Sequence, residues 1–158
     1  MPSKTFEENV KFEKRIQTEL DYIYKNIFGD CIISRLGTSK YDLIITDNMT
    51  NKQYTIQEKI IRNSYSRLSV EIIQDIVTGN LGWIYKCQSD FLHWVMCDNQ
   101  SPHIIYRVKL ADFRSWYFQN CWHYSPDTFR LETDGWGKTF YQLIPINDIP
   151  ELETIKLT

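Results

Sequence analysis

The sequence has few of the residues that build disulfide scaffolds, zinc sites or flexible linkers. Its four cysteines are widely spaced, with no C-x-x-C pair and no histidine at zinc-ligand spacing, so we expect reduced, buried thiols. Six glycines and five prolines form no low-complexity segment. The three histidines have no serine or cysteine partner at a recognisable spacing, which argues against a histidine-activated nucleophile.

Long apolar runs and a basic excess are also missing. No apolar stretch approaches the roughly 20 residues that span a bilayer, and the first residues lack the apolar region of a signal peptide. We therefore expect no membrane partner and an intracellular, cytoplasmic location. A net charge of -2 argues against a protein that coats nucleic acid through overall positive charge, although it leaves room for a local basic groove.

Apolar and aromatic residues are plentiful. With 42% hydrophobic residues in 158, the composition predicts one globular domain, 1–158, with its own core. Aromatic residues include ten tyrosines and five tryptophans, and they are more frequent in the second half, above all in 116–124 and 135–138. These aromatic residues suit core packing or a subunit interface, with base stacking on nucleic acid as the alternative.

Hydrophobic spacing predicts an alternation of helices and strands. A helix is expected over about 4–26, ended by Gly29, followed by strands over 31–34, 41–46 and 53–60, the last two joined as a hairpin. Ser69 as an N-cap and Gly79 as a stop predict a second helix over 69–78. Strands over 91–97 and 103–108, a helix over 110–120 and a tail of further strands complete the expected order.

Polar residues occupy two of the expected strands at positions where a core strand would be apolar. Asp42 begins one strand, and Gln57, Glu58 and Lys59 are consecutive on the next. Side chains alternate along a strand, so Gln57 and Lys59 share one face and Glu58 lies on the other unless a bulge intervenes. Burying unpaired polar groups is costly, so this clustering indicates a functional site.

The order of these elements and residues resembles the PD-(D/E)XK nuclease superfamily, whose core is α-β-β-β-α-β. Asp42 matches the first acid of its motif, Gln57-Glu58-Lys59 matches the acid-x-Lys half, and Glu13 matches a glutamate carried on the first helix. The resemblance covers about 6–110, with 111–158 as a C-terminal extension. Gln57 stands where most members have an acid. A small bacterial intron-encoded homing endonuclease of the superfamily also has glutamine at this place.

The resemblance implies an α/β fold with a mixed sheet flanked by helices, and metal-dependent hydrolysis of DNA phosphodiester bonds. Asp42, Gln57 and Glu13 would hold Mg²⁺, or Mn²⁺ in its place, through oxygen ligands. Lys59 would orient the attacking water and neutralise developing charge. The expected catalytic residues are thus Glu13, Asp42, Gln57 and Lys59, with Glu58 as a substitute ligand if a bulge exchanges its face with that of Gln57.

Cationic residues near this motif suit a polyanionic partner. Arg62 and Arg67 lie in a loop rich in serine and tyrosine after Lys59, and Arg35 and Lys40 frame the turn before Asp42. We expect these four to contact double-stranded DNA through its phosphates.

The expected activity is site-specific cleavage of the homing or restriction type by a homodimer or homotetramer, because cutting both strands needs two sites. A junction resolvase is the alternative within the class. Neutral Gln57 also leaves open a non-catalytic nuclease-fold protein that binds DNA or acts as an inhibitor.

Overall fold

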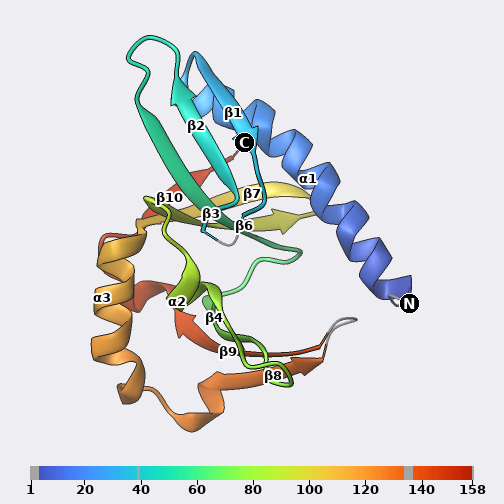
Figure 1. The fold of residues 1–158 in the computed structure, drawn as a ribbon, viewed down its shortest axis with the longest axis vertical. Coiled ribbons are helices and arrows are strands. Elements are labelled where there is room, and N and C mark those ends of the chain that lie inside the picture. The colour runs from blue at the N-terminus through green and yellow to red at the C-terminus, as the bar shows by residue number, and fades with distance from the viewer. Residues whose placement is uncertain (1–3, 39, 134–136, 158) are drawn as a thin grey trace.

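A computed structural model describes residues 4–38, 40–133 and 137–157. The fold is mixed α/β, as predicted, with two sheets (Figure 1). Sheet A has six strands in the order β1-β2-β3-β6-β7-β10, antiparallel except for the parallel pair of β3 and β6. Sheet B has four antiparallel strands in the order β5-β4-β9-β8.

The strands and helices of the described chain have the following bounds. The helices are α1 (Lys4–Phe28), α2 (Trp83–Lys86) and α3 (Leu110–Asn120). The strands of sheet A are β1 (Cys31–Arg35), β2 (Leu43–Asp47), β3 (Gln53–Ile61), β6 (Phe91–Asp98), β7 (Ser101–Lys109) and β10 (Glu153–Lys156). The strands of sheet B are β4 (Arg67–Asp75), β5 (Asn80–Leu81), β8 (Phe129–Thr133) and β9 (Lys138–Pro145).

The first helix confirms its sequence prediction and covers one face of sheet A (Figure 1). Ile16, Leu20 and Tyr24, four residues apart, are fully buried. They pack against Leu43 and other residues of the sheet, because residues four apart lie on the same face of a helix. Gly29 follows the helix with φ +80°, a backbone conformation that suits glycine at a helix end.

The hairpin predicted between 41 and 60 is confirmed as β2 and β3. The two strands pair antiparallel, with Leu43 opposite Ile56. The connecting turn is held by the Asp47 carboxylate, whose Oδ1 accepts hydrogen bonds from the backbone N–H groups of Met49 and Thr50. This is the Asx-type turn that an Asp-Asn-rich segment favours.

The helix predicted over 69–78 is wrong, because this segment forms β4 and the turn after it. Leu68 and Val70 are buried while Ser69 between them is partly exposed, which is the two-residue period of a strand. β4 pairs with β9, about 70 residues further along. That pairing supplies the backbone hydrogen bonds that a helix would have made internally, and Gly79 with φ +74° belongs to the turn between β4 and β5.

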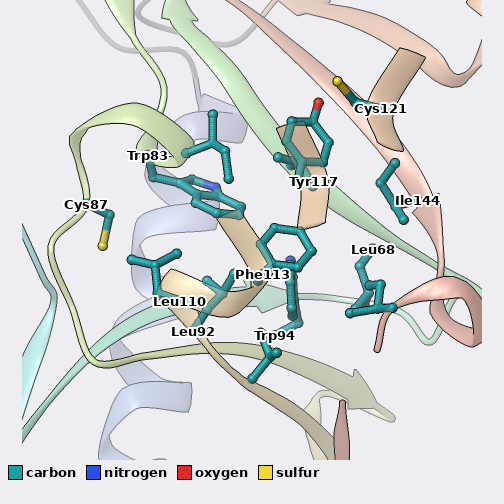
Figure 2. Packing of buried hydrophobic residues seen from close by; sticks show 14 of the residues in the cluster. Leu68, Trp83, Cys87, Leu92, Trp94, Leu110, Phe113, Tyr117, Cys121 and Ile144 are labelled. Carbon is teal, nitrogen blue, oxygen red and sulfur yellow. The ribbon is translucent and has the colours of Figure 1, made fainter. Parts of the chain in front are cut away.

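Besides the hydrophobic core under α1, a second core lies between sheet A and the layer formed by α2, α3 and sheet B. Phe113 of α3 packs edge-on against Trp94 of β6, with ring centroids 5.2 Å apart and an interplanar angle of 79°. Figure 2 shows Phe113 among Tyr117 of the same helix, Trp83 of α2 and Leu68 of β4. Elements after residue 110 therefore share a core with those before it.

The aromatic tail divides between the interior and the surface. Phe113 and Tyr117 are buried, and Trp116 packs against the same cluster, whereas Trp122 is 83% exposed. Trp136 and Gly135, part of the second aromatic stretch, lie outside the described residues. Within the described chain no helix is long and apolar enough to cross a membrane.

Candidate functional site

The pairing of β2 with β3 places the two predicted ligands side by side. Leu43 is opposite Ile56 in this antiparallel ladder, and the backbone N–H of Asp42 donates to the Ile56 carbonyl at 2.9 Å. This bond, and the hydrogen bond that the Asp42 carboxylate accepts from the Glu58 backbone N–H, place Asp42 directly beside the middle of β3. Because Ile56 packs in the core under α1, Gln57 projects from the other face of β3, and Asp42 lines the same cavity as Gln57.

All four predicted catalytic residues line one cavity of about 410 Å³. Glu13 comes from α1, Asp42 from the segment before β2, and Gln57 and Lys59 from β3. The wall is completed by residues that include Glu58, Glu71 and Lys86. Residues spaced over 46 positions of the chain are thus gathered around one polar hollow.

Asp42 is half-buried and has a perturbed acidity. One carboxylate oxygen, Oδ2, accepts a 2.7 Å hydrogen bond from the backbone N–H of Glu58. Burial raises the pKa of Asp42 to about 6, and the nearby charge of Glu58 adds to the rise, while that hydrogen bond, Arg35 and Lys59 oppose it. Burial thus disfavours the charged form of Asp42, and a cation bound at this carboxylate would favour it.

Glu13 lies at the rim of the cavity. Its side chain is exposed along the helix, but surrounding protein atoms desolvate the carboxylate, and this raises its pKa. Lys59 and Arg62 lower that pKa through their positive charges, and Glu58 raises it. Lys59 therefore acts electrostatically on both Glu13 and Asp42.

The side-chain amide of Gln57 is held by a buried thiol. Cys87 Sγ lies 3.4 Å from Gln57 Oε1 and 3.0 Å from the Lys40 carbonyl, both of which can accept its proton. Burial raises the pKa of Cys87, so the thiol stays protonated and able to donate. This contact was not predicted, because nothing in the sequence relates Cys87 to a position 30 residues earlier.

Glu58 alternates with Gln57 and Lys59 along β3, yet it also lines the cavity and forms part of a buried charged network. Its Oε2 accepts a 2.6 Å hydrogen bond from the Tyr24 hydroxyl, and its Oε1 pairs with Arg35 Nη1 at 2.9 Å. Arg35 also pairs with Asp21 through Nε at 2.8 Å. The network ties α1 to β1 and β3, and the backbone N–H of the same Glu58 holds Asp42.

The four predicted DNA-contacting cations lie in different surroundings. The guanidinium of Arg35 is turned inward, with 19% of its side chain exposed and two carboxylates bound. Lys40 is exposed beside the cavity. Arg62 and Arg67 line a second hollow of about 610 Å³, which shares Lys59 and Glu71 with the first cavity.

A third hollow, of about 880 Å³, extends the basic surface towards α1. Phe12 lies between two guanidinium groups, with Arg62 4.4 Å and Arg15 5.5 Å from the ring centroid. Arg62 lines both this hollow and the second one. The wall of this third hollow carries Lys11 as a further cation, together with the acidic side chains of Glu8 and Asp98.

The oxygen groups of the cavity suit a hard divalent cation. Over the described ranges, no three His, Cys, Asp or Glu side chains are placed so that they alone could hold a metal ion. Carboxylates of Asp42 and Glu13 together with the Gln57 amide oxygen supply oxygen donors of the kind that Mg²⁺ accepts alongside water. A cation bound there would also favour the charged form of Asp42.

Comparison with known proteins adds no family to these observations. The chain matches no protein-family model and no curated protein.

Proposed function

We propose that this chain is an Mg²⁺-dependent DNA endonuclease of the PD-(D/E)XK type. The observation that carries the proposal is the convergence of Glu13, Asp42, Gln57 and Lys59 on one cavity. Asp42, Gln57 and Lys59 were selected from the strand pattern, and Glu13 by its match to the superfamily, so their convergence supports both lines of reasoning.

The order and pairing of the elements around the cavity agree in part with those of the superfamily core. A helix is followed by three antiparallel strands, and β3 then pairs in parallel with β6. The superfamily core has the same sequence of one helix and three strands, with a crossover to a further strand. Here the crossover carries β4, β5 and the four-residue α2 in place of one long helix.

The residues divide the chemistry between them. Asp42, the Gln57 amide oxygen and Glu13 would hold Mg²⁺ or Mn²⁺, and the bound ion would polarise the scissile phosphate and lower the pKa of a water molecule. Lys59 places a compact positive charge on the same face as Gln57, where it can orient the water and stabilise charge on the phosphate. Asp42 is fixed for this task by the Glu58 backbone N–H.

Double-stranded DNA is the substrate that the surrounding charge favours. Arg62 and Arg67 line the hollow that joins the cavity, and Arg15 lies beyond them, which suits a phosphate backbone passing the site. We further propose that a homodimer or homotetramer supplies the second active site for the other strand, and that the enzyme cuts at defined sites. All four cysteines are free and buried, which supports a reducing, intracellular location.

The test is a cleavage assay with increasing Mg²⁺ on mixed plasmid DNA and on a four-way junction. The wild-type chain should give discrete duplex products only with the metal, and Asp42→Asn or Lys59→Ala should lower the rate by at least about 100-fold. Asp112→Asn and Lys109→Ala, exposed positions on other elements, are the matched controls and should cleave normally.

The same assay distinguishes the alternatives. Cleavage of the junction alone would assign the chain to the resolvases. DNA binding without products at any metal concentration would assign it to the non-catalytic class that a neutral Gln57 permits. Normal cleavage by both site variants would show that the chemistry lies elsewhere.

A further inference from the structure

The outward face of sheet B is polar, and it is built on a rigid core. Leu68, Val70 and Ile144 turn inward and are fully buried in the hydrophobic core. Arg67, Ser69 and Glu71 of β4 alternate with them and line the hollow of about 610 Å³, as does Tyr141 of β9. This face, which we call the outer face of sheet B, is therefore held in position by buried side chains on the other side of the same strands.

Three side chains form a row across this face. Glu71 is opposite Tyr141, and Tyr141 is opposite Arg130 of β8. Residues directly opposite in neighbouring strands share a face, and strands are about 4.8 Å apart, so the row spans roughly 10 Å. The major groove of B-DNA is about 12 Å wide and admits a β-ribbon.

The chemistry of the row suits base edges better than phosphates. Arg130 offers hydrogen-bond donors, Glu71 offers acceptors, and the Tyr141 hydroxyl offers both. Glu132, next along β8, lies close enough to Tyr141 that its charge and a hydrogen bond raise the Tyr141 pKa, after the larger effect of burial. A surface that contacted only phosphates would have no use for two carboxylates, whereas cytosine N4 is a donor that Glu accepts.

The row formed by Glu71, Tyr141 and Arg130 lies beside the acidic cavity. Lys59 and Arg62 of the β3 end form another wall of the same hollow, and Lys59 and Glu71 belong to both the hollow and the cavity. Bases lying on sheet B would therefore be adjacent to a phosphate at the cavity. Arg62 and Arg67, at the same hollow, are placed to hold the backbone.

We propose that the outer face of sheet B enters the major groove of duplex DNA and that Arg130 and Tyr141 contact base edges next to the cleaved phosphate. This inference rests on the proposed function and names the surface that determines its cleavage site. Arg62 and Arg67 then bind phosphates without regard to sequence.

The test is a binding selection from duplexes with a randomised segment, using the full chain with Ca²⁺ in place of Mg²⁺. The wild-type chain should enrich one sequence pattern. Arg130→Gln and Tyr141→Phe should each reduce discrimination at one or two adjacent positions by roughly tenfold or more, while binding to the random pool changes little. Both positions are partly exposed, and unchanged melting temperatures would establish that the variants fold.

Two further variants separate phosphate binding from base recognition. Arg62→Gln should weaken binding to all duplexes alike and keep the wild-type pattern. Lys156→Gln removes a charge from β10, at the far edge of sheet A, and should leave both affinity and pattern unchanged.

The outcomes distinguish the two proposals. If the wild-type chain enriches a pattern that Arg130→Gln and Tyr141→Phe both retain in full, or if it binds DNA with no pattern at all, base contact by sheet B is overturned while DNA cleavage still stands. If the wild-type chain neither binds nor cuts duplex DNA, the proposed function fails, and base contact fails with it.

Discussion

At the scale of single residues, the buried carboxylate of Asp42 that suits cation binding also lowers the stability of the metal-free protein. Asp42 is half-buried beside Glu58 and has a pKa of about 6. A carboxylate in an unfolded chain titrates near 3.9, so the folded protein binds this proton more tightly than the unfolded one. The charged form of Asp42 therefore lowers the stability of the metal-free protein.

Replacing Asp42 by asparagine should make the metal-free protein more stable and inactive. Because the folded pKa is raised, the penalty is absent at about pH 4, grows as the pH rises to about 6, and is complete above that. Asp42→Asn should then raise the free energy of unfolding by about 1–3 kcal/mol at pH 7.5 and by little at pH 4. Urea titrations at the two pH values measure this difference.

The control for this prediction is Asp112→Asn, at an exposed position in the first turn of α3. It should show no comparable gain at pH 7.5. A loss of stability in Asp42→Asn at neutral pH would contradict the assigned burial of this carboxylate.

The hydroxyl of Tyr24 should stabilise the charged network behind the site. It donates to Glu58 Oε2 at 2.6 Å and contacts His93 Nδ1 at 3.1 Å, all in the buried interior. Tyr24→Phe leaves a buried carboxylate with one donor fewer, and we expect a loss of about 1–3 kcal/mol in the free energy of unfolding. Tyr22→Phe, on the same helix with Tyr22 72% exposed, is the matched control and should cost almost nothing.

At the scale of elements, local pattern determined most of the fold but not β4. The segment Ser69–Thr78 carries a capping serine, an early glutamate and a closing glycine, and it still forms a strand because β9 and the core behind it offer better burial. Helix propensity is a weak prior that tertiary contacts override.

Val70 and Val77 provide a direct test of β4. Val70 is fully buried in the strand, and Val77 is 77% exposed in the turn after it. Val70→Ala should lower the free energy of unfolding by roughly 2 kcal/mol, from lost burial and the cavity left behind. Val77→Ala should change it by under about 0.5 kcal/mol. Similar effects of the two substitutions would contradict the alternation of burial along the strand.

Sequence pattern alone predicted the hairpin and the alternation of side chains along β3. The Asp-Asn-rich turn and the alternation of Gln57, Glu58 and Lys59 are local features, and they translate directly into strand geometry. The inward turn of Arg35 could not be predicted, because Asp21 and Glu58 reach it from separate elements. The hydrogen bond from the Cys87 thiol to Gln57 Oε1 also depends on long-range packing.

At the scale of the whole molecule, a nearly neutral chain gathers charged groups of both signs around three adjoining hollows. The net charge of -2 conceals an acidic cavity joined to hollows lined by Arg62, Arg67, Arg15 and Lys11. Overall charge is therefore a poor guide to the partner of this protein, while the local arrangement favours a polyanion next to a cation site.

This arrangement predicts a salt-dependent affinity for DNA. The logarithm of the binding constant should fall linearly with the logarithm of salt concentration, because phosphate contacts release counterions. Arg67→Gln should reduce the steepness of that line by about 1, as expected for the loss of one phosphate contact. Lys109→Gln, on the exposed end of β7, should leave the slope unchanged, and an equal reduction in both variants would place the DNA elsewhere.

Anomalous diffraction from crystals soaked in Mn²⁺ shows whether Asp42, Gln57 and Glu13 form a site for a hard divalent cation. An anomalous peak should appear in the cavity, roughly 2–2.5 Å from an Asp42 carboxylate oxygen and from Gln57 Oε1, and it should disappear in Asp42→Asn. An ordered, open cavity without a peak at saturating Mn²⁺, or a peak bound only by residues outside it, would contradict the account.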